Sequence, residues 1–218
     1  MNKKARNFFI STILSLLAIV FTILVKVVDV KSVGVNDTNI GFVTLNQFVF
    51  KLVGVNMIWY HITDWLGIFS VFLAIGYVLI GGCQLIKRKS IFKVDKEIIM
   101  LAVFYVAVIL IYALFENVIV NYRPILINGI LEASYPSSHT LMITCIYGSS
   151  IILNKKLCNV KITKIINVLS SAIIVITVVG RLISGVHWFT DIVGGILISI
   201  ALLWIFYSVI NKNYYETK

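Results

Sequence analysis

The stretch RLISGVHWFTDIVGGILISIALLWIFYSVI, residues 181–210, places an arginine, a histidine and an aspartate directly before a long apolar run. A run of about 20 apolar residues is long enough to cross a bilayer as a helix. Ionisable side chains at the edge of a span are costly to bury, so they indicate a functional site. Arg181, His187 and Asp191 are therefore candidate site residues.

The whole chain has the composition of an integral membrane protein. Of its 218 residues, 60% are hydrophobic and 13% are charged, and the mean hydropathy is +0.99. These values lie outside the range of soluble globular domains. The net charge of +10 comes from lysines and arginines that cluster beside the apolar runs. We interpret this clustering as a topology signal, and we expect no nucleic-acid partner.

Six apolar segments predict an all-α fold, because a backbone in lipid has to satisfy its own hydrogen bonds. The fourth and fifth segments are short for a span and need flanking polar residues. We expect a polytopic six-helix bundle that forms a single domain over residues 1–218, with a motif-bearing core at about 98–210. The segments are Phe8–Val28, Leu66–Ile86, Ile98–Val120, Thr140–Leu153, Ile165–Val179 and Trp188–Ile210.

Basic residues predict the orientation in the cell membrane. If the N-terminus is inside, the inner segments carry fourteen of the nineteen lysines and arginines, which favours cytoplasmic termini and an outward-facing site. The outer segment between the first two spans contains TNIGFVTLNQFVFKLVG, residues 38–54. We expect it to form an interfacial helix, with Thr38 or Asn39 as its cap and Gly54 as its stop.

The residues of the opening stretch suit phosphate chemistry. His187 and Asp191 are spaced i, i+4 and would share one face of a helix. A carboxylate that accepts a proton from one imidazole nitrogen leaves the other free to attack a substrate or to bind a metal. The planar guanidinium of Arg181 can hold a phosphoryl group with two hydrogen bonds.

Two further segments supply similar groups on the same predicted side. In EASYPSSHTLM, residues 132–142, Ser137 and Ser138 read as the start of a helix, where free amides bind anions. His139 would then stand beside a bound phosphate as a general acid. In NYRP, residues 121–124, Arg123 adds a second cation.

Each segment also has a purely structural interpretation. Arginines at span ends often extend to the interface, Ser-Ser-His can simply cap a helix, and a His–Asp pair can lie on a helix surface. The occurrence of all three segments on one predicted face favours a phosphate site.

The segments RP, YPSSH and RLISGVHWFTD, in this order and between these spans, resemble the signature motifs of the type 2 phosphatidic acid phosphatase family. The resemblance implies a six-helix membrane phosphatase with its site at the outer face and with no metal or other cofactor. It implies that His187 becomes phosphohistidine, that Asp191 orients it, and that His139 protonates the leaving alcohol. The groups implied to hold the phosphoryl oxygens are Arg123, Arg181, Ser137 and the backbone near Ser138.

The sequence departs from the family pattern at three positions. Glu116 stands where the family usually has lysine, Ser138 where it has glycine, and Gly180 where it has serine. One interpretation is that Glu116 is a solvated carboxylate at the membrane interface. The alternative hypothesis is that Glu116 holds Arg123 or a substrate hydroxyl, and that Lys51 supplies the missing cation.

The expected activity is hydrolysis of a lipid phosphomonoester or pyrophosphate, with phosphatidic acid, phosphatidylglycerol phosphate and polyprenyl pyrophosphate as candidate substrates. One alternative is a phosphotransferase that passes the phosphoryl group to an alcohol. Another is a non-catalytic lipid-phosphate binder or transporter subunit. Charges in the middle of the spans would favour a transporter, whereas here the ionisable groups lie near the span ends.

Overall fold

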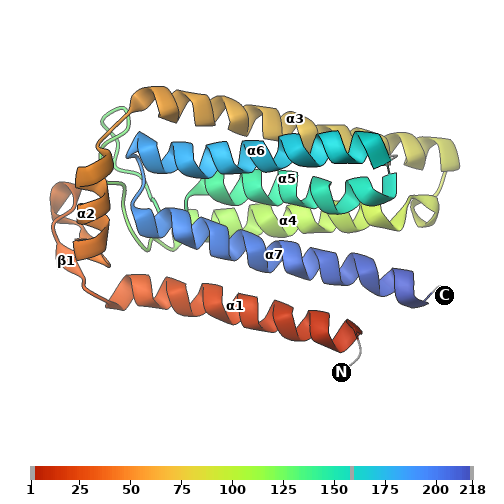
Figure 1. Ribbon diagram of the computed structural model, residues 1–218, viewed down its shortest axis with the longest axis horizontal. Coiled ribbons are helices and arrows are strands. Elements are labelled where there is room, and N and C mark those ends of the chain that lie inside the picture. The colour runs from red at the N-terminus through yellow and green to blue at the C-terminus, as the bar shows by residue number, and fades with distance from the viewer. Residues whose placement is uncertain (1–2, 158–159, 217–218) are drawn as a thin grey trace.

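The computed structural model describes residues 3–157 and 160–216, which form long helices running side by side (Figure 1). A two-stranded antiparallel pair and two short 3-10 helices, η1 and η2, lie in the connections. The elements in chain order are α1 (Lys3–Val27), β1 (Lys31–Ser32), η1 (Val35–Asp37), β2 (Asn39–Ile40), α2 (Val43–Val53), α3 (Met57–Arg88), η2 (Ile91–Lys93), α4 (Lys96–Asn117), α5 (Ser138–Leu157), α6 (Val160–Ser184) and α7 (Phe189–Glu216).

The predicted all-α membrane fold is confirmed. In the described part of the chain, five helices are long and apolar enough to cross a membrane, namely α1, α3, α4, α6 and α7. The remaining predicted segment is α5, which takes in polar residues at both ends, as expected. The largest difference concerns α3, which begins at Met57 and not near Leu66. The side chain of Asn56 caps it by accepting hydrogen bonds from Ile58 N at 3.1 Å and Trp59 N at 3.4 Å.

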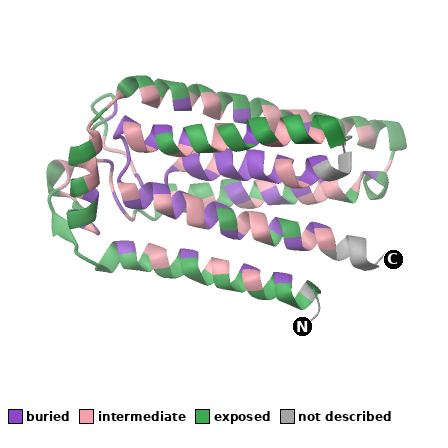
Figure 2. Cartoon of the chain, in the orientation of Figure 1, coloured by how far each residue is buried: buried purple, intermediate pink, exposed green. Residues whose placement is uncertain are grey.

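Helix α5 forms the centre of the bundle and packs against α3, α4, α6 and α7. Figure 2 shows an almost continuous buried surface along it, whereas the outer faces of α1, α3 and α6 are exposed. Small residues allow this close packing, because a Cβ at Gly148 would lie 2.5 Å from Leu203 Cδ1. Some polar side chains of α5 find partners on neighbouring helices, and Tyr77 Oη of α3 lies 2.7 Å from Ser150 Oγ. Helix α5 is therefore shielded from lipid by its neighbours, whereas the outer faces of α1 and α3 are exposed to lipid.

The helix ends are arranged so that the bundle has two different poles. The start of α1 and the end of α7 lie together at one pole, and α2 lies across the other (Figure 1). Helix α1 is peripheral and packs mainly on α7. Long connections at the α2 pole join α1 to α3 and α4 to α5, and the short α6–α7 connection is also there.

Helix α2 is anchored to the bundle by Asn46, which is fully buried. The Asn46 amide donates to Thr190 Oγ1 at 2.9 Å and its oxygen accepts from Thr190 N at 3.1 Å. On the opposite side Phe48 and Leu52 are 66% and 75% exposed, which is the arrangement of a helix lying in a membrane interface.

One of the two predicted ends of α2 is confirmed and the other is wrong. Gly54 does end α2, with φ +71°. The expected start at Thr38 or Asn39 is wrong, because Asn39 pairs with Ser32 in the β1–β2 hairpin and the helix begins after Phe42.

Candidate active site

The three motif segments meet at the α2 pole, around His187. This histidine lies in the connection between α6 and α7, since α7 begins only at Phe189. Gly185 permits the tight turn, because it has φ +66° and a Cβ there would lie 3.1 Å from Val55 Cα. Within this connection His187 is only 3% exposed.

The hydrogen bond on Nδ1 fixes the tautomer of His187. Nδ1 lies 3.1 Å from the backbone oxygen of Ser134. A carbonyl oxygen can only accept, so Nδ1 carries the proton and Nε2 carries the lone pair. Nε2 is buried without a hydrogen-bond partner among the residues that the structure describes. The ring therefore presents a free nucleophilic nitrogen.

The surroundings also keep His187 neutral. Burial of the ring lowers the pKa of His187 well below its usual value of 6.5, because burial disfavours the charged form. Nearby positive charge lowers the pKa further, and it comes from Arg123, Arg181 and His139. A neutral imidazole is the form that can attack phosphorus.

Asp191 is fully buried beside this histidine but does not bond to it directly. Asp191 Oδ2 lies 3.9 Å from His187 Nδ1, which is too far for a hydrogen bond. The carboxylate instead accepts from Trp188 N at 2.8 Å, from Asn121 Nδ2 at 3.3 Å and from Ser134 Oγ. Ser134 Oγ is 3.1 Å from His187 Nδ1 and so links the two groups. Thus Ser134 contacts both members of the predicted pair.

Two arginines lie beside His187, and each is paired with a carboxylate. Arg181 belongs to the last turn of α6 and is fully buried. Its NH2 lies 2.5 Å from Asp64 Oδ1. Arg123 lies in the α4–α5 connection, and its Nε is 3.0 Å from Glu132 Oε2. Both guanidinium groups retain a buried nitrogen, NH1, that has no partner within the described ranges.

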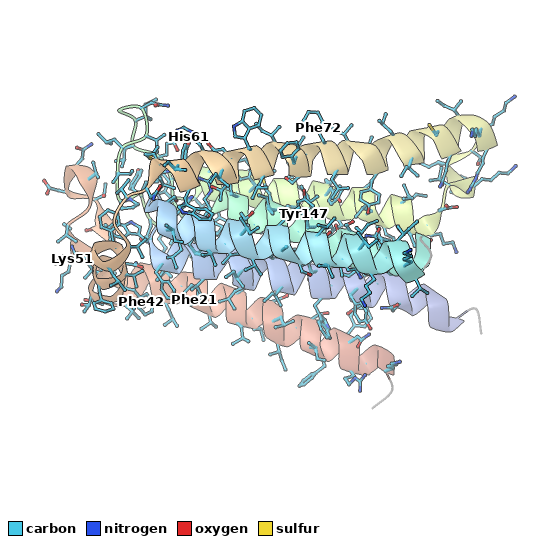
Figure 3. All side chains as sticks on the ribbon, turned by 45° about the horizontal axis from the view of Figure 1, so that its top comes forward. Phe21, Phe42, Lys51, His61, Phe72 and Tyr147 are labelled. Atoms are coloured by element: carbon cyan, nitrogen blue, oxygen red, sulfur yellow. The ribbon has the colours of Figure 1, made fainter. Side chains whose placement is uncertain are left out.

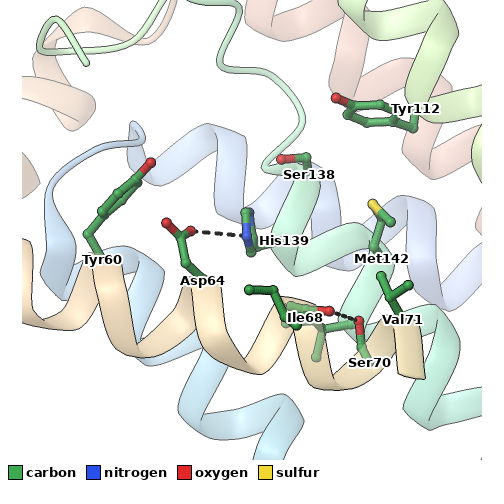
Figure 4. Close-up of a pocket in the computed structure, with 11 residues that line it drawn as sticks. Tyr60, Asp64, Ile68, Ser70, Val71, Tyr112, Ser138, His139 and Met142 are labelled. Atoms are coloured by element: carbon green, nitrogen blue, oxygen red, sulfur yellow. Dashed lines mark hydrogen bonds and ion pairs between the residues drawn. The ribbon is translucent and has the colours of Figure 1, made fainter. Parts of the chain in front are cut away.

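The start of α5 completes the cluster. Ser137 N donates to the backbone oxygen of Asp191 at 3.0 Å, and Ser137 O accepts from Leu141 N at 2.9 Å. These bonds hold the first turn of α5 against α7. His139 Nε2 lies 3.1 Å from Asp64 Oδ1 (Figure 4). The predicted helix start at Ser137–His139 agrees with the observed start of α5 at Ser138.

Several buried polar atoms in this cluster lack a hydrogen-bond partner among the described residues. Hydroxyls, guanidinium nitrogens and the amides of a helix N-terminus together suit a tetrahedral anion such as phosphate. For the residues described, these atoms are Arg123 NH1, Ser137 Oγ, His139 Nδ1, Thr140 Oγ1, Arg181 Nε, Arg181 NH1 and His187 Nε2.

Two openings reach the cluster. A cavity of about 440 Å³ lies between α3, α4 and α5, with Asp64 and His139 at its polar end and Ile68 and Val71 along its apolar wall (Figure 4). A narrower recess is lined by His187, Ser138 and Tyr112, among others. Tyr112 and Ser138 border both openings. The larger cavity thus combines a polar end with an apolar wall.

The two accessory residues lie in different places. Glu116 is exposed in the last turn of α4 and lines the recess together with His187. Lys51 is exposed in the last turn of α2, at the edge of the molecule (Figure 3), and it lines neither opening. Arg123 pairs with Glu132 rather than with Glu116. The structure therefore brings Glu116 to the site and leaves Lys51 outside it.

The most important residue that the sequence did not reveal is Asp64, which joins Arg181 to His139. An aspartate within an apolar helix would have indicated a functional residue. The predicted span began at Leu66, however, and therefore placed Asp64 in a loop. Asn121, Glu132 and Ser134 carried no such signal, because their roles depend on the path of the α4–α5 connection. The described residues contain no group of three or more His, Cys, Asp or Glu side chains placed to hold a metal ion.

The chain is similar to known proteins in both fold and sequence. A solved structure of a transmembrane PAP2 type phosphatidylglycerolphosphate phosphatase from Bacillus subtilis has the same fold, with a TM-score of 0.67 and 18% sequence identity over 93% of this chain and 96% of that chain. The comparison with curated proteins found no match. The sequence model of the PAP2 superfamily matches residues 98–215, which is more than half of the chain and includes all three motif segments. The chain therefore belongs to the PAP2 superfamily.

Proposed function

We propose that this protein is a membrane lipid phosphatase that works through a phosphohistidine on His187. The observation that carries the proposal is the buried Nε2 of a neutral His187, which has no hydrogen-bond partner in the described part of the chain and lies beside the guanidinium groups of Arg123 and Arg181. A nucleophile alone would not indicate phosphate, and arginines alone would not indicate catalysis. Together they provide both attack and charge stabilisation.

In the first step His187 Nε2 attacks phosphorus and the bond from phosphorus to the lipid oxygen breaks. His139 gives its proton to that oxygen, so the lipid leaves as a neutral alcohol. The two arginines and Ser137 hold the three non-bridging oxygens while charge shifts onto them.

In the second step water attacks phosphorus and the phosphorus–nitrogen bond breaks. His139, now neutral, accepts a proton from the water, and inorganic phosphate is released. Both steps use side chains of this chain alone, and the proposed mechanism includes no metal ion.

The substrate class follows from the position of the site. The polar cluster lies at the end of the apolar helices, and the 440 Å³ cavity joins the Asp64–His139 end to an apolar wall. An amphiphile can place its phosphate in the cluster while its tails stay in lipid. We propose a lipid phosphomonoester or diphosphate of the phosphatidic acid, phosphatidylglycerol phosphate or polyprenyl type, and the similar fold of a phosphatidylglycerolphosphate phosphatase supports this class.

The orientation is part of the same proposal. The site lies at the pole opposite the start of α1 and the end of α7 (Figure 1), and the basic residues favour a cytoplasmic location for those ends. The site would then face the outside of the cell membrane.

The decisive experiment traps the covalent intermediate. Purified protein in detergent is mixed with phosphatidic acid labelled in its phosphate, quenched during turnover, and tested for acid-labile, base-stable label. We expect label on the wild type and none on His187→Ala. Phosphate release is measured in parallel for the three substrate types. If no substrate releases phosphate and labelled phosphatidic acid leaves no label on the wild type, the proposal is wrong. Transfer of label to an added alcohol would indicate a phosphotransferase.

A further inference from the structure

Asp64 lies next to two groups of the proposed mechanism, His139 and Arg181. It lies in α3, across the cavity from α5, and its Oδ1 is shared between two donors: His139 Nε2 at 3.1 Å and Arg181 NH2 at 2.5 Å. Figure 4 shows the carboxylate of Asp64 directed at the ring of His139. The side chain of Asp64 is 33% exposed and that of His139 is 28% exposed, so both border the cavity. A carboxylate in a membrane helix is costly and needs a reason.

The orientation of the imidazole ring gives that reason. A Cβ built at Gly67 would lie 3.0 Å from His139 Cδ2 and 3.1 Å from Nε2, so the Cδ2–Nε2 edge of the ring faces α3. Nδ1 lies across the ring from that edge and therefore points away from α3. Nδ1 is buried, and within residues 3–157 and 160–216 it has no hydrogen-bond partner. One nitrogen is thus occupied by Asp64 and the other is free.

We propose that Asp64 is a positioning residue for His139, and this inference rests on the proposed function. Asp64 holds the proton on Nε2, so Nδ1 is the nitrogen that exchanges protons. In the first step Nδ1–H is given to the leaving oxygen, and the ring that remains is the neutral Nε2–H form that Asp64 favours. In the second step the same Nδ1 accepts a proton from water. The carboxylate also stabilises the imidazolium that exists between turnovers.

A simpler role for Asp64 would be to neutralise Arg181, which is fully buried. The two roles make different predictions. Arg181 acts on the phosphoryl oxygens, so its disturbance slows attack for every leaving group to the same degree. An acid matters only when the leaving group is a poor one, because an activated phenolate leaves without a proton. The dependence on the leaving group therefore separates the two roles.

The kinetic experiment compares Asp64→Asn with the wild type by the rate of phosphohistidine formation, using phosphatidic acid and p-nitrophenyl phosphate. A general acid raises a reaction rate by about 10²–10⁴-fold. We expect Asp64→Asn to slow phosphohistidine formation by at least about tenfold with phosphatidic acid. With p-nitrophenyl phosphate, we expect the rate to fall by less than about threefold. In a His139→Ala background, the further loss that Asp64→Asn causes with phosphatidic acid should fall to under about threefold, the same as with p-nitrophenyl phosphate. Equal losses with both substrates, or a full additional loss in that background, would overturn the inference.

Gly67→Ala provides a matched variant that leaves every charge in place. Its methyl group would press on the Cδ2–Nε2 edge of His139 without touching the pair between Asp64 and Arg181. We expect the same selective loss with phosphatidic acid, even if Asp64→Asn fails to fold. An unchanged ratio of the two rates in Gly67→Ala would contradict the assigned ring position.

A measurement without turnover distinguishes this inference from the proposed function. In protein with ¹⁵N-labelled histidine, NMR at a pH where His139 is neutral reports which nitrogen carries the proton. His139→Ala assigns the signal among the three histidines. We expect Nε2–H in the wild type and a mixture of tautomers in Asp64→Asn. An Nδ1–H form in the wild type would contradict the inference. An Nε2–H form in a protein that never forms phosphohistidine would contradict only the proposed function.

Discussion

Asp191→Asn tests how His187, the proposed nucleophile, is held in place. In serine-protease triads the carboxylate bonds directly to the imidazole, and the same change costs about 10⁴-fold in turnover because the wrong tautomer forms. Here the carbonyl of Ser134 fixes the tautomer of His187 and Asp191 lies 3.9 Å from the ring. We therefore expect a smaller loss than in the triads.

The size of the loss follows from the bonds that Asp191 makes. An asparagine oxygen can still accept from Trp188 N and Ser134 Oγ, but each bond loses its charge and therefore about 1 kcal/mol. The new amide would face the Asn121 amide, which now lies 3.3 Å from the carboxylate. The total is about 2–3 kcal/mol, or about 30- to 150-fold if all of it falls on the transition state.

The assay is phosphate release from phosphatidic acid in detergent, together with the midpoint of thermal unfolding. We expect Asp191→Asn to retain measurable turnover and to unfold at a lower temperature, since the lost bonds also join the α4–α5 connection to α7. His187→Ala serves as the inactive reference. A 10⁴-fold loss of turnover with an unchanged midpoint would refute this reasoning, because it would require a direct bond between Asp191 and His187.

Three further predictions concern charge and topology. Arg123→Gln should move the acid limb of kcat/KM to higher pH, because Arg123 is one of the cations that lower the pKa of His187; the substrate's own titration is common to both proteins, so an unmoved limb contradicts this effect. Glu116→Lys should lower KM for phosphatidic acid by about three- to tenfold at low salt and much less at high salt, because it replaces an anion with a cation in the recess of His187; an unchanged KM at low salt would place Glu116 outside the field of the phosphate. In a cysteine-free background, an impermeant thiol reagent on intact cells should label Ile130→Cys but not Phe92→Cys, which are 62% and 94% exposed at opposite poles; the reverse pattern would invert the proposed orientation.

The helices could be predicted from the sequence because their signal is local. Apolar runs and flanking charges do not depend on the rest of the fold, and all six predicted segments lie within helices or, at their ends, directly beside them. The start of α3 was the exception. Its first turns, MIWYHITDW, contain His61 and Asp64, so their hydropathy resembles that of a loop. Because the start of α3 was placed near Leu66, Asp64 was not included in the predicted site.

The predicted site residues were brought together with one exception, Lys51, but their connections were not predictable. His187 was expected on a helix with Asp191, whereas Gly185 and the bond from Trp188 N to Asp191 keep it in the preceding turn. The contacts of Ser134 and Glu132 depend on how residues 118–137 cross the pole. Spacing along the chain contains no information on such contacts between distant segments.

The peripheral position of α1 affects how the protein is assembled in the membrane during its synthesis. Its main neighbour is α7, and the contact between Ser11 Oγ and Ser208 Oγ at 3.3 Å joins residues 197 positions apart. At roughly 5–20 residues per second, a ribosome takes about 10–40 s to make that stretch. For this time α1 sits in the bilayer with Ser11 lacking its final partner. The nascent chain therefore depends on lipid, or on the insertion machinery, to hold α1 until α7 arrives.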